Sequence, residues 1–271
     1  MKLYDVNAVP KPVRRLYALG KWRLLRIPFA LQYEAALLQN APIERLVQLL
    51  PTPTKPTIYW VELKKVKLHA SLHYQPGKLC MEGDWDINMT HPLPSIFKPA
   101  PKSAKKWDLH ETVRGMFLLG KTYKATPQYA SMVEAVKRKS VNPPQGCRTM
   151  EQVHLYFRQL IKAFDSMQKS GYLTQEELGM PSSGEIRLHL TRNGSLCLGG
   201  GGNHRIRMAE ILGIQWVPFI LRGVHPALVV QLSQQYTLPP HKALAHWLTS
   251  NFPIIKPKAS EAHLTSHGER S

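Results

Sequence analysis

The sequence predicts an α+β protein, in which a helical and β-rich N-terminal region packs against a C-terminal module of strands and helices. Three observations lead to this prediction: strand-like alternation between residues 57 and 87, three helix-start signals between residues 108 and 171, and a hairpin pattern followed by a glycine run after residue 185. With 271 residues, the chain is long enough to bury a substantial core. Its 43% hydrophobic and 20% charged residues exclude a fibrous or wholly disordered chain.

The first predicted elements are one helix and several strands. Apolar residues at helical spacing predict a helix over residues 42–50, and the prolines of residues 51–56 end it and form a stiff, extended connector. β-Branched, aromatic and alternating residues predict strands between residues 57 and 73. The sequence Gln75-Pro-Gly77 predicts a turn, after which another strand is expected over residues 79–87.

Three helices are predicted next, each from a start signal. An aspartate with a glutamate three residues later opens the helix expected over residues 108–120, and a Thr-Pro pair opens the helix expected over residues 126–139. The third helix, over residues 149–171, begins with a Thr-x-x-Gln capping box and ends at a glycine. Its apolar residues step by three and four along one face, which is typical of a helix packed on a core.

The C-terminal module has the most specific pattern in the chain. Residues 186–198 alternate between apolar and polar around Asn193-Gly194, which predicts a β-hairpin. Four glycines follow at residues 199–202, then a short helix is expected over residues 203–213 and another strand over residues 215–221. The predicted order is therefore strand, strand, glycine run, helix, strand.

A glycine run before a helix allows the backbone to approach a ligand, and its amides together with the helix dipole favour an anion. A phosphate-binding site is therefore predicted at six consecutive residues: Gly200, Gly201, Gly202, Asn203, His204 and Arg205. The run is neither a P-loop, because no Lys-Ser/Thr follows, nor a GxGxxG dinucleotide motif. The alternative is a tight packing turn that binds no ligand.

The same residues carry a family resemblance. Asn193-Gly194, the box at residues 202–205, Leu212-Gly213 and Val217-Pro218 resemble the signature of the ParB/sulfiredoxin-like superfamily. The resemblance implies binding of a nucleoside triphosphate, ATP or CTP, because members include CTP-binding partition proteins, ATP-using sulfiredoxins and kinases of free serine. Sulfiredoxins carry their catalytic cysteine at the position of Asn203, so thiol chemistry is not expected here.

A second resemblance covers residues upstream of the box. Gly83-Asp-Trp-Asp86, Gly120-Lys-Thr-Tyr123 and Gly171-Tyr172 resemble a group of prokaryotic proteins of unassigned activity that carry the same Gly-Asp-Trp-Asp motif. This resemblance implies no known reaction.

The motif itself belongs to an acidic patch in a basic chain. On a strand, Glu82, Asp84 and Asp86 would share one face, and Trp85 would turn into the core. Asp84 and Asp86 are therefore candidate Mg²⁺ ligands and, with His204, candidate catalytic residues for phosphoryl transfer, provided that they approach the glycine run. The alternative is a solvated turn paired with surface lysines.

The bulk charge favours an anionic partner. Lys and Arg number 36 against 18 Asp and Glu, a formal net charge of +18. The leading hypothesis is a nucleotide-binding protein acting as a Mg²⁺-dependent phosphotransferase or NTPase; the alternative is a non-catalytic basic module that binds nucleic acid.

The expected organisation is a basic region at residues 1–149, the ParB/sulfiredoxin-like module at residues 150–253 and a disordered tail at residues 254–271. Three cysteines without a CxxC pair favour free thiols in a reducing compartment. No signal peptide or membrane-spanning run is recognisable, so a cytoplasmic location is expected. The oligomeric state is not predicted.

Overall fold

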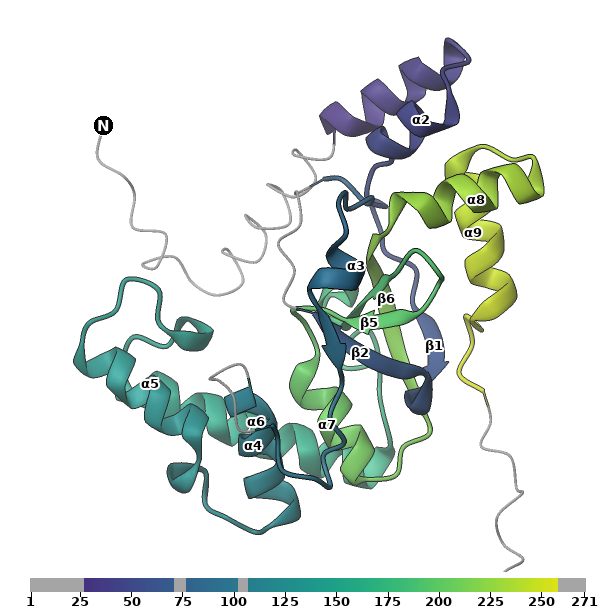
Figure 1. Cartoon of the computed structure of the whole chain (residues 1–271). Helices are drawn as coiled ribbons and strands as arrows, with labels where there is room; N and C mark the ends of the chain where they lie inside the picture. The colour runs from purple at the N-terminus through teal and green to yellow at the C-terminus, as the bar shows by residue number, and fades with distance from the viewer. Residues whose placement is uncertain (1–26, 71–76, 102–106, 258–271) are drawn as a thin grey trace, which may run out of the picture.

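The computed structural model of the chain describes residues 27–70, 77–101 and 107–257 (Figure 1). The α+β class is confirmed, since helices surround one six-stranded mixed sheet. The strands are β1 (Tyr59–Glu62), β2 (Val66–Ala70), β3 (Thr90–Pro92), β4 (Ile186–Leu190), β5 (Leu196–Leu198) and β6 (Trp216–Val224). The helices are residues 27–38, α2 (Ile43–Leu49), α3 (Trp85–Asn88), α4 (Asp108–Val113), α5 (Pro127–Lys137), α6 (Met150–Ser170), α7 (Asn203–Ile211), α8 (Pro226–Tyr236) and α9 (Pro240–Asn251).

The sheet combines strands from distant parts of the chain. Its order is β1-β6-β4-β5-β2-β3, with β4 parallel to β6 and β2 parallel to β5, and with the other neighbours antiparallel. Strands β1 to β3 lie in residues 1–149 and strands β4 to β6 in residues 150–253. The two predicted segments therefore contribute to one sheet and share its core.

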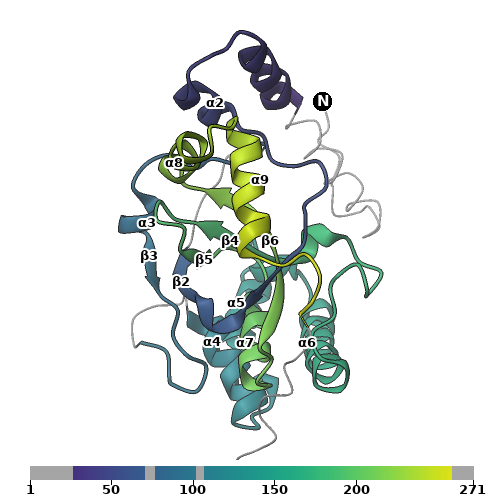
Figure 2. The ribbon, with the colours of Figure 1, turned by 90° about the vertical axis from the view of Figure 1, so that its right-hand side faces the viewer.

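The helices form two groups at opposite ends of the sheet (Figures 1 and 2). The upper group contains residues 27–38, α2, α8 and α9, and α8 contacts both α2 and α9. The lower group contains α4 to α7, in which α4 and α6 both contact α7. The two ends of the sheet are therefore covered by different helices.

Helix α6 shows how local signals set the predicted elements. The Thr149 hydroxyl accepts the Gln152 N–H at 3.3 Å, which confirms Thr149 as the N-cap, and the Gln152 side chain reaches back one residue further, to the Arg148 N–H at 2.7 Å. Gly171, with φ of 69°, ends the helix as expected. The helices predicted from residues 42, 108 and 126 and the β-hairpin at residues 186–198 are confirmed as well.

The strand predicted over residues 79–87 is wrong. Only isolated bridges at Lys78 and Cys80 have strand pairing there, and the chain then turns into the short helix α3. Gly83 turns the chain with φ of +82°, and the Trp85 indole N–H donates to the Met81 carbonyl at 2.9 Å. Trp85 is buried, as expected, but a turn and a helix place it there instead of strand alternation.

Other expectations have mixed outcomes. Residues 75 and 76 of the predicted turn and residues 258–271 of the predicted tail lie outside the described residues. Cys80, Cys147 and Cys197 are buried free thiols. Within the described ranges, no helix is both long and apolar enough to cross a membrane.

Candidate functional site

The glycine loop, residues 199–202, connects β5 to α7 and lies against the beginning of β4. The Gly199 N–H donates to the Arg187 carbonyl at 3.0 Å, and the Arg187 N–H donates to the Gly201 carbonyl at 3.2 Å. These bonds continue the β4–β5 pairing beyond the end of β5. The loop therefore places the N-terminus of α7 at the end of the sheet where β4 begins.

Three of the four glycines are explained by packing. A Cβ at Gly199 or Gly201 would lie 2.2 or 2.7 Å from a β4 side chain, and a Cβ at Gly202 would lie 2.7 Å from the Ile186 Cα. Gly202 also has φ of +83°, in the region that favours glycine. At Gly200, by contrast, no described atom lies within 4 Å of an added Cβ. The packing alternative thus accounts for residues 199, 201 and 202, and Gly200 faces open space.

The N-terminus of α7 opens beside Gly200. Gly202 is the N-cap residue and supplies no side-chain cap, and the first N–H bonded within the helix is that of Ile206, to the Gly202 carbonyl at 3.0 Å. The Asn203 side chain donates to the Gly199 carbonyl at 3.2 Å, so it braces the loop. Helix geometry leaves the N–H groups of residues 203–205 without an acceptor inside the helix, which is the arrangement that binds anions.

Arg205 is tied to a buried carboxylate. Its Nη1 lies 3.2 Å from Glu185 Oε2, and its Nη2 donates to the Gly184 carbonyl. The Glu185 side chain is fully buried and also accepts the Gln175 N–H. Burial raises the pKa of Glu185 despite these partners. Arg205 therefore holds the beginning of α7 to the beginning of β4, in addition to lying at the predicted binding site.

Arg187 is a second cation at the glycine loop. Its Nη2 donates to the Ser183 carbonyl at 3.2 Å, next to the Gly184 carbonyl that Arg205 binds, and its side chain passes over Gly201. The sequence interpretation did not include Arg187 among the site residues. Its signal was available, because it alternates with apolar residues on the predicted strand beside the glycine run.

His204 points away from this charge. Its Nε2 lies 2.9 Å from the Tyr156 hydroxyl and 3.2 Å from the Gln128 side-chain oxygen, and the Gln128 amide donates to Tyr156 at 3.0 Å. Burial, reinforced by the neighbouring Arg205, lowers the pKa of His204 to about 4. The imidazole is therefore neutral at pH 7, and it links α7 to α5 and α6.

Two carboxylates of the acidic patch pair with Arg192, a residue that sequence reasoning missed. The Asp86 carboxylate accepts the Arg192 backbone N–H at 2.8 Å and its guanidinium at 2.8–3.1 Å, and Asp84 contacts the same guanidinium. Burial alone would raise the pKa of Asp86, but the hydrogen bonds from Arg192 lower it below its usual range. Glu82 pairs with Lys78 at 2.6 Å, but the Lys78 side chain is only 12% exposed and both aspartates pair with an arginine, so the alternative of surface lysines holds at most for Glu82.

The acidic patch and the glycine loop do not meet. Arg192 follows the end of β4, whereas Gly201 and Gly202, which lead into α7, pack on Arg187 and Ile186 at its beginning. Five extended residues span about 17 Å, so the expectation that Asp84 or Asp86 approaches the loop is wrong. In the described part of the chain, no group of three His, Cys, Asp or Glu side chains is arranged to hold a metal.

Comparisons of the chain with protein-family models, with curated proteins and with solved structures found no match. The ParB/sulfiredoxin-like resemblance therefore stays a prediction. The order of elements expected for its segment is confirmed, as β4, β5, the glycine loop, α7 and β6.

The contacts of the loop predict a sharp difference between two of its glycines. Gly202→Ala should lower the free energy of unfolding by more than about 1–2 kcal/mol, because the left-handed backbone and the contact with Ile186 both disfavour a Cβ. Gly200→Ala is the matched control and should change it by less than about 0.5 kcal/mol. Urea denaturation of both variants measures the difference, and equal midpoints would contradict the packing argument.

The buried ion pair predicts a stability defect for Arg205→Met. This variant leaves the Glu185 carboxylate buried without its cation, so the free energy of unfolding should fall by about 3–5 kcal/mol. In the double variant Glu185→Gln with Arg205→Met, no unpaired charge remains, and much of that loss should be recovered. A double variant as unstable as the sum of both single variants would show that the pair contributes no coupling.

The lowered pKa of His204 predicts destabilisation by acid. Because the folded protein disfavours the proton, the contribution of His204 is complete above about pH 6.5, its unfolded pKa, and is lost as the pH falls toward about 4. His204→Gln should therefore reduce the slope of unfolding free energy against pH in this window by up to about 1.4 kcal/mol per pH unit. Buried His189, whose pKa is also lowered to about 4, keeps its own contribution in the variant. An unchanged slope would contradict the buried, neutral imidazole.

Proposed function

We propose that the glycine loop and the N-terminus of α7 bind a phosphate group of a nucleotide. The observation that carries this proposal is the uncapped beginning of α7, which opens beside Gly200 and is flanked by the guanidinium groups of Arg187 and Arg205. Backbone N–H groups at a helix N-terminus and a nearby guanidinium are the donors that phosphate oxygens prefer.

The local charge balance supports an anion at this place. Glu185 pairs with the Arg205 guanidinium, and the Arg187 side chain lies beside the positive end of the helix dipole. His204 adds no charge, because its imidazole is neutral at pH 7. The formal net charge of +18 favours the approach of an anion from any direction.

The proposed ligand class comes from the resemblance to the ParB/sulfiredoxin-like superfamily, whose members bind ATP or CTP through the corresponding box. The loop would supply donors for one phosphate group, and these donors do not distinguish one base from another. The proposal therefore names a nucleoside triphosphate and leaves the choice between ATP and CTP to experiment.

The proposal is confined to binding. Phosphoryl transfer required Asp84 or Asp86 beside the loop with Mg²⁺ between them, and both carboxylates bind Arg192 at the other end of β4. Nucleotide binding is therefore expected without added Mg²⁺. The basic module that binds nucleic acid is the competing outcome of the test.

The proposal predicts that Arg187→Met weakens nucleotide binding. Loss of a charge-assisted contact should lower the affinity for ATP or CTP at least about tenfold, measured by calorimetry without Mg²⁺. Arg138→Met is the matched control, because Arg138 is exposed at the C-cap of α5 and its side chain pairs with Glu134. The control should bind like the unmodified protein.

Two results would overturn the proposal. One is equal affinity of the folded Arg187→Met variant and the control. The other is no saturable nucleotide binding together with binding of duplex DNA or RNA that weakens steeply with salt, which would favour the nucleic-acid module.

A further inference from the structure

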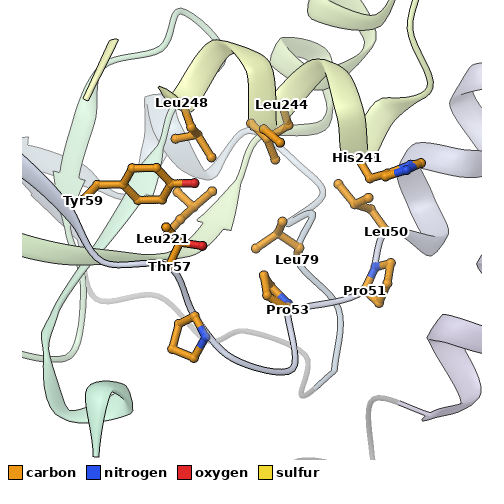
Figure 3. A pocket seen from close by; sticks show the side chains of 12 residues that line it. Leu50, Pro51, Pro53, Thr57, Tyr59, Leu79, Leu221, His241, Leu244 and Leu248 are labelled. Carbon is orange, nitrogen blue, oxygen red and sulfur yellow. The ribbon is translucent and has the colours of Figure 1, made fainter. Parts of the chain in front are cut away.

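A pocket of about 180 Å³ lies in the upper helical group, away from the glycine loop (Figure 3). One wall is the proline-rich connector after α2, the opposite wall is α9, and β1 and β6 form the base. Its lining residues are Leu50, Pro51, Pro53, Pro56, Thr57, Tyr59, Leu79, Leu221, His241, Leu244, Ala245 and Leu248.

The connector wall is fixed by backbone hydrogen bonds. The Thr52 N–H donates to the Gly77 carbonyl at 3.0 Å, and the Leu79 N–H donates to the Leu50 carbonyl at 2.8 Å. The segment that receives the connector is itself joined to the sheet, because the Met81 N–H donates to the Val224 carbonyl at 3.0 Å. This wall therefore keeps its place without a ligand.

Helix α9 is held at both ends. Near its beginning, His241 Nδ1 lies 2.8 Å from the Tyr33 hydroxyl of the first described helix. After its end, the Trp60 N–H donates to the Pro253 carbonyl at 2.8 Å, which ties the chain to β1. With both walls anchored, the pocket is a preformed cavity, the kind of site that binds small molecules.

The lining is apolar and uncharged. None of the described residues that line the pocket is Asp, Glu, Lys or Arg, although the chain as a whole is strongly basic. Burial raises the pKa of Tyr59, so its hydroxyl stays protonated, and burial lowers the pKa of His241. The polar groups at the pocket are thus the neutral imidazole of His241 and, side by side in Figure 3, the hydroxyls of Thr57 and Tyr59.

From this geometry we infer that the pocket binds a neutral, single-ring molecule that carries one hydroxyl group. An apolar cavity of roughly 150 Å³ accommodates benzene, whereas pockets for drug-sized ligands measure roughly 300–1,000 Å³. The ring would pack between the leucines of α9 and the prolines of the connector. The ligand hydroxyl would bond to the Thr57 and Tyr59 hydroxyls, because a buried polar group requires a partner. This inference does not depend on the phosphate site.

Phenol and benzene are the probes for this pocket, with binding to the full chain measured by calorimetry and ligand-observed NMR. Both should bind saturably, and phenol should bind more tightly. Tyr59→Phe should lower the affinity for phenol about three- to tenfold and change that for benzene less than twofold, because only the hydrogen bond is lost.

A second pair of variants tests the location. Ala245 is exposed at the rim of the pocket, so Ala245→Trp can occlude it without overfilling the core, and should weaken both probes at least tenfold. Ser250→Trp places the same side chain at an exposed position of α9 that does not line the pocket, and should bind like the unmodified protein. Absence of saturable binding of either probe, or full binding by Ala245→Trp, would overturn the inference.

Discussion

The close approach of the glycine loop to the beginning of β4 is the constraint on which the rest of this architecture depends. Strands β4 and β6 are parallel neighbours, so the chain between them must cross from one end of the sheet to the other. It does so through β5, the loop and α7. A Cβ would collide with the backbone of β4 at residue 202, where φ is also positive and glycine is required, and with β4 side chains at residues 199 and 201. The same requirement leaves α7 without a capping side chain, and a packing constraint thereby creates a site suited to an anion.

Two buried polar networks fix the N-terminus of α7 in the position that the glycine loop permits. Arg205 joins it to Glu185 at the beginning of β4, and His204 joins it to Tyr156 and Gln128 on the neighbouring helices. Buried polar groups are costly unless their partners are in place, so each network restricts the position of α7. The proposed phosphate site would therefore be preorganised, and a ligand would lose little free energy in ordering it.

The sequence interpretation succeeded where the signal is local and failed where it depends on distant partners. The cap of α6, the hairpin and the helix after the glycines each depend on a few consecutive residues, and all are present. The turn at Gly83 depends on a positive φ and on a buried tryptophan that packs against His189 and His225, which alternation along residues 79–87 does not reveal. Likewise, only the tertiary structure places Arg192, more than a hundred residues away in the sequence, on Asp86.

The charge of the chain and the geometry of the loop have separate consequences for binding. At the loop, Glu185 pairs with Arg205, whereas the formal net charge of +18 belongs to the chain as a whole. The field of the whole molecule therefore accelerates the approach of an anion and is screened by salt. In the proposed phosphate site, the N–H groups of α7 and the guanidinium of Arg187 would act at contact distance and would govern dissociation. Added salt should consequently slow the association of a nucleotide much more than it accelerates its release. For a polyanion held through many surface lysines, added salt should also accelerate release strongly.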